Sequence, residues 1–262
     1  MKYVASVSFG KDSLAQLIKI KELGLPLDEV IYVYIKFSDA IDGGYPLMNE
    51  WIPEAEKILY EDFGIEITHL SGKSFVEQFF TRKRRGKNAG KIYGFPLTMG
   101  AWCNRTLKMD VINQYIRDID EGITMYVGIA YDEPNRVEGL LKKSNKKITY
   151  KSVLHDEKIT ELEAFAICKA HGLLSPIYTN GKLFRDGCWF CVKQPHYSLF
   201  YLYSNYPDYW NELLELEQEH EKVYYYTSLA NSTFRQLNDR FENGYIPKPS
   251  KKLPDWIRGD VC

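Results

Sequence analysis

The stretch Tyr3-Val4-Ala5-Ser6-Val7-Ser8-Phe9-Gly10-Lys11-Asp12-Ser13 decides the fold. Its first half, Tyr3 to Ser8, is typical of a β-strand, and Ser13 to Leu23 carries apolar residues at helical spacing before Gly24 ends the pattern. The short polar loop between them places the N–H groups of a helix start at the end of a strand. The stretch therefore predicts a strand, a loop and a helix that can hold an anion such as phosphate, with Lys11 adding a full positive charge.

The alternation of strand and helix continues through the N-terminal half. Residues 29–35, Glu-Val-Ile-Tyr-Val-Tyr-Ile, have too little polar alternation for a half-exposed strand and favour a parallel strand covered on both faces. Further elements are predicted as helices over 53–63 and 108–118 and as strands over 66–70 and 124–129. We therefore expect an α/β fold with a doubly wound, mostly parallel sheet.

The character of the sequence changes after Ile148. A predicted helix over 160–171 and a turn-rich segment are followed by an aromatic, helical region over 197–226 and a Pro/Lys-rich, extended segment over 247–254. We expect a nucleotide-binding α/β domain over residues 1–150. A C-terminal addition over 151–262, with a Cys-x-x-Cys turn and aromatic helices, is expected to pack on it.

Composition excludes several classes of protein. The chain has 34 basic and 35 acidic residues, so its overall charge indicates neither a nucleic-acid nor a membrane partner. No apolar run approaches the roughly 20 residues of a membrane span, and the first residues are too short a run for a signal peptide. An odd number of cysteines, five, argues against a disulfide framework. We expect a soluble cytoplasmic protein without a membrane partner, of an oligomeric state that the sequence does not indicate.

The glycine pattern of the loop excludes two common nucleotide motifs. A Walker A loop needs four residues between its first glycine and a Gly-Lys-Ser/Thr ending, and a dinucleotide fingerprint needs three glycines. The loop at 8–13 has neither. A simpler alternative is an ordinary turn in which Asp12 or Ser13 caps the helix.

The segment Ser8-x-Gly10-Lys11-Asp12-Ser13 resembles the Ser-Gly-Gly-x-Asp-Ser pyrophosphate loop of the ATP pyrophosphatase, or adenine nucleotide alpha-hydrolase-like, superfamily, with Phe9 in place of the first glycine. Later segments, in the same order along the chain, are similar to its phosphoadenosine phosphosulfate reductase branch: Trp102-Cys103-x-x-x-Leu107-Lys108, Gly128-Ile129-x-x-Asp132-Glu133-x-x-Arg136, Pro176-Ile177-Tyr178 and Arg185-x-Gly187-Cys188-x-x-Cys191. The resemblance covers residues 3–195 and implies a sheet of about five parallel strands.

The resemblance also implies roles for individual residues. It assigns ATP or another adenine nucleotide to the loop, and phosphate or sulfate contacts to basic residues of the later motifs. The implied nucleotide-binding residues are Ser8, Phe9, Gly10, Lys11, Asp12, Ser13, Arg105, Lys108 and Arg136. An aspartate does not bind phosphate without a cation, so Asp12 would cap the helix or help to hold Mg²⁺. The alternative for the three later basic residues is a solvated surface charge.

Two cysteines, Cys188 and Cys191, have a spacing that suits zinc, an iron–sulfur cluster or a redox dithiol. The resemblance implies Cys103 as a third ligand, because family members with a cluster draw ligands from these same two regions. Several adenylating RNA thiolases are similar in having three cysteines, which leave one iron of a [4Fe-4S] cluster open to carry sulfur. The alternatives are structural Zn²⁺, with Cys103 and His196 completing the site, and buried thiols without metal.

Residues 82–91, Arg-Lys-Arg-Arg-Gly-Lys-Asn-Ala-Gly-Lys, form a basic stretch without an acidic residue. Such a loop can hold tRNA, another nucleic acid or a second anionic substrate by its phosphates. The alternative is an ordinary surface loop.

These features favour an enzyme that cleaves ATP at the alpha-phosphate, gives AMP and pyrophosphate, and so activates an acceptor for sulfur transfer. Lys11, Asp12 and Cys103 are its predicted catalytic residues. A phosphoadenosine or adenosine phosphosulfate reductase is the first alternative, although the Glu-Cys-Gly-x-His signature of those reductases is absent around Cys262. A non-catalytic nucleotide- or nucleic-acid-binding module is the second.

Overall fold

The computed structural model of the chain describes residues 1–97, 101–220 and 232–258. It divides into two compact units. The first comprises residues 1–34, 47–70 and 111–180, and the second comprises 35–46, 71–110 and 181–262. This division differs from the expected single boundary at residue 150. Residues 35–46 and 71–110 belong to the second unit, and residues 151–180 belong to the first.

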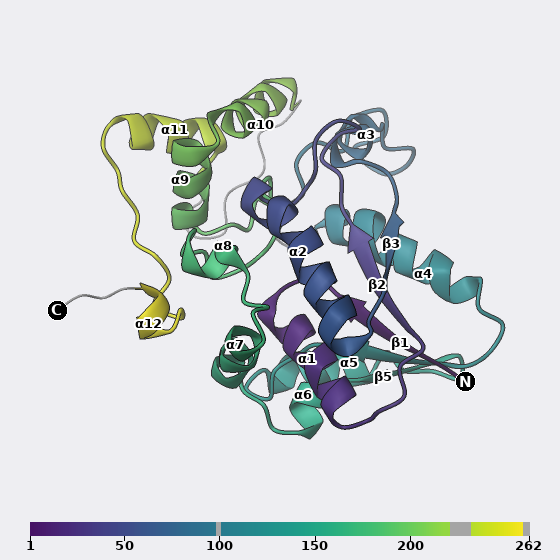
Figure 1. The fold of residues 1–262 in the computed structure, drawn as a ribbon. Helices are drawn as coiled ribbons and strands as arrows, with labels where there is room; N and C mark the ends of the chain where they lie inside the picture. Colours follow the sequence, from purple (N-terminus) through teal and green to yellow (C-terminus); the bar gives the residue numbers. More distant parts are fainter. Residues whose placement is uncertain (98–100, 221–231, 259–262) are drawn as a thin grey trace. The chain divides into compact units, whose positions relative to one another are not determined.

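The first unit is built on a five-stranded sheet with the strand order β3-β2-β1-β4-β5 (Figure 1). The strands are β1 (Lys2–Val7), β2 (Glu29–Tyr34), β3 (Ile67–Ser71), β4 (Ile123–Val127) and β5 (Ile148–Lys151). Strand β1 pairs in parallel with β2 and β4, and β4 pairs in parallel with β5. The chain thus moves outward from β1 to β3 and returns on the other side of β1. The carboxyl ends of β1 and β4 form a topological switch point, where open α/β sheets bind ligands.

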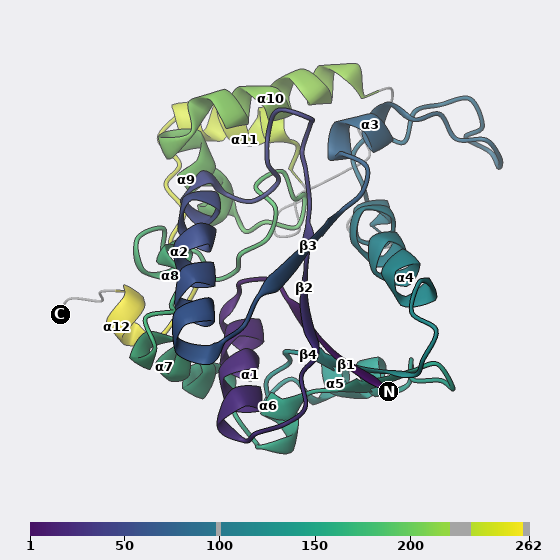
Figure 2. The ribbon, with the colours of Figure 1, turned by 45° about the vertical axis from the view of Figure 1, so that its right-hand side comes forward.

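Helices cover both faces of this sheet, and the predicted doubly wound α/β fold is confirmed. The helices are α1 (Lys11–Glu22), α2 (Pro46–Phe63), α4 (Asp110–Arg117), α5 (Pro134–Leu141), α6 (Val153–Asp156), α7 (Glu161–Ala170) and α8 (Pro176–Thr179). Figure 2 shows α1 and α2 on one side of the sheet and α4 on the other. On the α4 side, Tyr115 and Ile116 pack on a buried cluster formed by Val4, Ile31, Ile123, Met125 and Ile148.

Some element boundaries differ from the predicted ones. Helix α2 begins at Pro46 and contains Pro53, where the sequence predicts its start. A π-helical segment, η1 (Asn104–Met109), precedes α4 where the sequence predicts one continuous helix from Lys108. Strand β5 and helix α5 were not predicted.

Phe9 has a backbone conformation that normally favours glycine. Its φ is +58°, and its ring is fully buried, with its centroid 4.9 Å from that of Tyr32 and 6.5 Å from that of Trp51. A left-handed conformation costs a non-glycine residue about 1–3 kcal/mol, and burial of a large apolar side chain contributes about 1.5–3 kcal/mol. The ring packing therefore offsets the backbone strain where the resembling loops have glycine.

The second unit is helical and rich in aromatic contacts. Its helices are α3 (Phe75–Phe80), η1, α9 (His196–Asn205), α10 (Pro207–Glu219), α11 (Phe234–Glu242) and α12 (Asp255–Arg258). The Glu217 carboxylate accepts the N–H groups of Phe234 and Arg235 at 3.1 and 2.8 Å and so joins α10 to the start of α11. The predicted aromatic helical region is confirmed as α9 and α10, and the part of it over 221–226 lies outside the described residues. None of the described helices has the length and apolar character that a bilayer crossing needs.

Gly128 lies directly after β4, against the first turn of α1. A Cβ atom at this position would lie 2.6 Å from the carbonyl oxygen of Asp12 and 2.7 Å from the Cα atom of Ser13. Both are backbone atoms, which cannot move aside as the end of a side chain can. The end of β4 and the start of α1 can therefore meet only through a glycine.

We predict that Gly128→Ala lowers the free energy of unfolding by about 1–3 kcal/mol, because the added methyl group overpacks this contact. Gly139→Ala is the matched control, since Gly139 lies within α5 and a Cβ atom added there would have no atom within 4 Å. It should raise stability by about 0.5–1 kcal/mol, as alanine does in a helix interior. Chemical denaturation measures both. Equal stability of the two variants would contradict the tight contact.

Candidate functional site

The loop at 8–13 lies at the carboxyl end of β1, where the switch point of the sheet falls. The Ser13 hydroxyl closes it: its oxygen accepts the Ser8 N–H at 3.1 Å and donates to the Gly10 carbonyl at 2.9 Å. Gly10 is the N-cap of α1 and has no side chain with which to cap this helix. Ser13 thus shapes the loop and does not cap the helix, and neither does Asp12.

The uncapped start of α1 gives the loop its positive end. A helix of twelve residues presents its first N–H groups and the positive end of its dipole at this point. The Lys11 N–H donates to the Tyr178 hydroxyl at 3.3 Å. Tyr178 belongs to the Pro-Ile-Tyr segment that carries part of the resemblance, but no local pattern predicts its position at the loop.

Three carboxylates gather beside the loop. Asp12, Glu133 and Glu161 each offer an oxygen, and these oxygens all lie within 4.8 Å of one another. The Asp132 carboxylate accepts the Glu161 N–H at 3.0 Å and so fixes the start of α7 here. Oxygen ligands in this number suit a hard divalent cation such as Mg²⁺. Sequence reasoning anticipated Asp12 for this role and missed Glu161, because nothing local marks a glutamate at the first turn of a distant helix.

Lys11 and Arg136 are paired with these carboxylates. The Lys11 Nζ lies 2.9 Å from Asp12 and 3.0 Å from Glu161, and the side chain is only 6% exposed. Arg136 forms a hydrogen-bonded ion pair with Glu133. Both cations were predicted to contact phosphate directly. Both side chains lie near the loop, but each forms an ion pair with at least one carboxylate.

The charges in this site shift one another's pKa values. Burial raises the pKa of Asp12, and the neighbouring Glu161 and Glu133 raise it further against the opposing effect of Lys11. Burial alone would lower the pKa of Lys11, but the carboxylates of Asp12 and Glu161 outweigh it, so the net direction is upward and the lysine stays charged. The pKa of Arg136 is raised, first by its bond to Glu133. The concentrated negative charge therefore favours a bound cation.

We predict that Mg²⁺ at about ten times its Kd raises the Tm by about 2–4 °C, because an ion that binds only the folded chain stabilises it. Glu133→Gln keeps the shape of the side chain and should remove most of this rise. Glu138→Gln is the control, since Glu138 lies on the same helix but is exposed and paired with Lys142 at 2.6 Å. Thermal unfolding with and without MgCl₂ measures the effect. An unchanged response of Glu133→Gln would exclude this residue as a ligand.

An aromatic cluster in the second unit brings together the segments that carry Cys103, Cys188 and Cys191. Phe75 lies at its centre, with its ring centroid 4.3 Å from Phe190 and 5.3 Å from Trp102. Trp189 packs at 4.4 Å from Phe37 and donates its Nε1–H to the Asp42 carbonyl at 2.7 Å. The aromatic neighbours of each cysteine thus hold the Cys-x-x-Cys turn beside Cys103.

The three thiols lie close enough to one another for the charge of one to affect the pKa of another. Burial raises the pKa of Cys103 to about 11, and the charge of Cys191 adds to this effect. Burial raises the pKa of Cys188 as well, with further contributions from Cys191 and Cys103 and an opposing one from Lys108. The structure therefore brings the three predicted cysteines together, with Lys108 near them.

The spacing of these thiols bears on which metal they fit. The sulfur atoms of the three cysteines do not all lie within 4.8 Å of one another, since the group of possible ligand atoms that meets this condition in the described residues is Asp12, Glu133 and Glu161. Two sulfurs bound to one zinc, each at about 2.3 Å, lie at most about 4.6 Å apart. Cysteines that bind separate irons of a cluster need a wider spacing. Cys103, Cys188 and Cys191 are thus a candidate ligand set for either a zinc ion or an iron–sulfur cluster.

Other predicted residues have different surroundings. The His196 Nδ1 lies 3.2 Å from the Tyr245 hydroxyl, so its ring contacts the segment that follows α11. Arg105 is exposed on η1, in the same unit as the cysteines. Cys168 is buried in the first unit, where its Sγ donates to the Lys11 carbonyl at 3.2 Å. Cys262 lies outside the described residues.

We predict that Cys188→Ser lowers the iron and labile sulfide content of anaerobically purified protein to less than about a tenth, because one of the three proposed ligands is lost. Phe75→Ala should lower it in part by loosening the contact between the two cysteine segments. Cys168→Ser is the control and should keep full content. Elemental analysis and the visible absorption spectrum measure this. A fully loaded Cys188→Ser variant would exclude the cysteine as a ligand.

The basic stretch 82–91 forms a hairpin-like excursion of the second unit. Arg82 and Ile92 form an antiparallel bridge, and the Lys83 N–H donates to the Lys91 carbonyl at 2.9 Å. Arg84, Arg85 and Lys87 at its tip are exposed. Their charges therefore face solvent, where a polyanion can reach them.

Comparison with known proteins finds no matching family model and no matching curated protein. Among solved structures, the chain is similar to the U34-tRNA thiolase NcsA from Methanococcus maripaludis with its [4Fe-4S] cluster, with a TM-score of 0.41 and 18% sequence identity over 100% of this chain and 79% of that chain. This degree of similarity does not assign a family, an activity or a cofactor to the chain.

Proposed function

We propose that the chain is an ATP-dependent adenylating enzyme, which cleaves ATP at the alpha-phosphate and activates an acceptor for sulfur transfer. The observation that carries this proposal is the arrangement at the switch point: an uncapped helix start, a loop closed by Ser13 and three carboxylates within 4.8 Å of one another. The first two features bind anionic oxygens, and the third binds a divalent cation. Together they suit a nucleotide polyphosphate with its metal ion.

In this proposal the loop N–H groups and the start of α1 hold the phosphates. Because Asp12, Glu133 and Glu161 would repel a bare polyphosphate, a cation between the two sets of oxygens is needed, and these three residues would hold it. Mg²⁺ in this place would neutralise the charge that builds up on the leaving pyrophosphate. Lys11 and Arg136 supply further positive charge at the same edge of the sheet.

The reaction requires an in-line attack. An acceptor oxygen attacks the alpha-phosphorus, the bond between that phosphorus and the oxygen bridging to the beta-phosphate breaks, and pyrophosphate leaves. The adenylated acceptor then reacts with a sulfide-level sulfur donor, which replaces the activated oxygen as AMP departs. The residues at 8–13 act by positioning and charge neutralisation, which supply most of the catalysis in phosphoryl transfer.

Cys103, Cys188 and Cys191 would hold a [4Fe-4S] cluster, which supplies an iron without a protein thiolate where sulfur can bind. The protein's own contribution is the aromatic cluster, which fixes the segments that carry the three thiols. A nucleic acid such as tRNA is the acceptor class that the exposed basic tip at 82–91 favours, because Lys and Arg side chains hold polyanions by their phosphates.

Lys11→Ala tests the nucleotide loop. We predict that it lowers pyrophosphate release from ATP, with bulk tRNA as acceptor and sulfide as donor, by about a hundredfold or more, as loss of a charge that stabilises the transition state does. Lys21→Ala is the control on the same helix and should react as the unchanged protein does. Chromatography of AMP and a coupled pyrophosphate assay measure the products.

Wild-type rates in Lys11→Ala would exclude the loop as the catalytic site. Tight ATP binding by the unchanged protein with no AMP under any acceptor condition would instead favour a non-catalytic nucleotide-binding module.

A further inference from the structure

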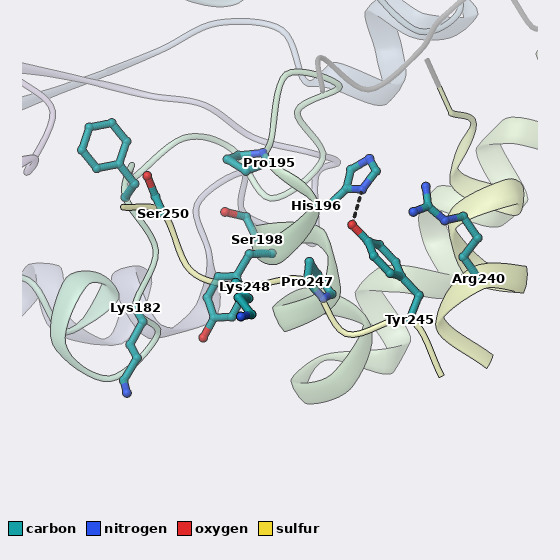
Figure 3. Close-up of a pocket in the computed structure, with 11 residues that line it drawn as sticks. Lys182, Pro195, His196, Ser198, Arg240, Tyr245, Pro247, Lys248 and Ser250 are labelled. Carbon is teal, nitrogen blue, oxygen red and sulfur yellow. Dashed lines mark hydrogen bonds between the residues drawn. The ribbon is translucent and has the colours of Figure 1, made fainter. Parts of the chain in front are cut away.

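A cavity lies in the second unit, between the start of α9 and the chain that follows α11 (Figure 3). Its volume is about 370 Å³. The residues that line it are Lys182, Phe184, Pro195, His196, Tyr197, Ser198, Arg240, Tyr245, Pro247, Lys248 and Ser250. Ligand pockets of proteins begin at about 300 Å³, so this cavity has room for one small ligand.

The charge of the lining is of one sign. Lys182, Arg240 and Lys248 are cationic, and none of the described residues that line the cavity is acidic. The Arg240 guanidinium lies 4.0 Å from the centroid of the Tyr245 ring, a cation–π contact that holds this charge in place. Arg240 and Lys248 are both exposed, so an entering ligand can reach them. A cavity lined in this way attracts an anion.

The start of α9 adds to this positive potential. His196, Tyr197 and Ser198 form the first turn of this ten-residue helix and line the cavity. Pro195 is the N-cap, and no side chain caps the helix. The positive end of the helix dipole therefore lies at the same cavity as the three cationic side chains.

Flat and neutral groups accompany these charges. Phe184 and Tyr197 contribute half-buried rings to the lining. Figure 3 shows the Tyr245 hydroxyl directed at His196, with 3.2 Å between the oxygen and Nδ1. Burial, followed by the charge of Arg240, lowers the pKa of His196, so this ring is neutral at physiological pH. Aromatic faces and neutral polar groups beside cations suit a base joined to a phosphate better than an inorganic anion.

We propose that this cavity is a second nucleotide site, in which Arg240, Lys248 and the start of α9 bind a phosphate and the rings of Phe184 and Tyr197 contact the base. This second site is additional to the proposed ATP site, which uses the loop at 8–13 in the other unit. Its ligand is one nucleotide, which is either a free mononucleotide or one residue of a single RNA strand.

Binding titrations test the site without any turnover. The protein is first saturated with Mg²⁺ and a non-hydrolysable ATP analogue, which fills the loop site, and is then titrated with uridine monophosphate and with an eight-residue oligouridine. The variants are Arg240→Gln and Lys248→Gln, and the control is Lys251→Gln, which is exposed on the same segment but does not line the cavity.

We expect each cavity variant to weaken binding about fivefold or more and to reduce its salt dependence, as loss of a phosphate contact does. The control should bind as the unchanged protein does. Oligouridine bound more tightly than the mononucleotide would identify an RNA strand, and equal affinities would identify a free nucleotide. Unchanged binding in both cavity variants, or no binding by the unchanged protein, would overturn the proposal. Because pyrophosphate release is not measured, this failure is separate from a failure of the adenylation proposal.

Discussion

The contact between Gly128 and the first turn of α1 is the constraint on which the candidate nucleotide site depends. Strands β1 and β4 are neighbours in the sheet, and the chain leaves both at the same edge. Only a residue without a Cβ lets the backbone after β4 approach the backbone of Asp12 and Ser13 so closely. This approach brings the loop of one strand and the Glu133 segment of the next to a common point, where a single ligand can contact both.

Most of the fold could be predicted from local patterns, and the site only in part. The apolar strands and the helix after the loop follow from periodicity, which is why the sheet unit was anticipated. Helix α2 was predicted too short because Pro53 sits within it, where tertiary packing overrides a local preference. Glu161 and Tyr178 reach the loop from α7 and α8, and no local pattern encodes such long-range contacts. The pairing of Lys11 with Glu161 was missed for the same reason.

Apolar residues position the segments that carry the three cysteines. Trp102 and Phe190 are sequence neighbours of Cys103 and Cys191, and both pack on Phe75. Hydrophobic burial therefore fixes the position of the sulfur atoms, whereas the ligands themselves need contribute little to the folding of this region. The Cys-x-x-Cys spacing predicts a candidate metal site from the sequence. The aromatic residues beside the cysteines, which no spacing rule covers, bring Cys103 to the same place.

Phe9 has a consequence for how a ligand meets the loop. Its ring is held in the sheet core while its backbone forms the second residue of the loop, so the loop cannot change its conformation unless the ring leaves Tyr32 and Trp51. A glycine in this position would leave the loop free to sample other shapes. In the proposed function, the phenylalanine makes the loop a preorganised receptor for phosphate, because its ordering entropy is lost during folding and does not weaken the later association.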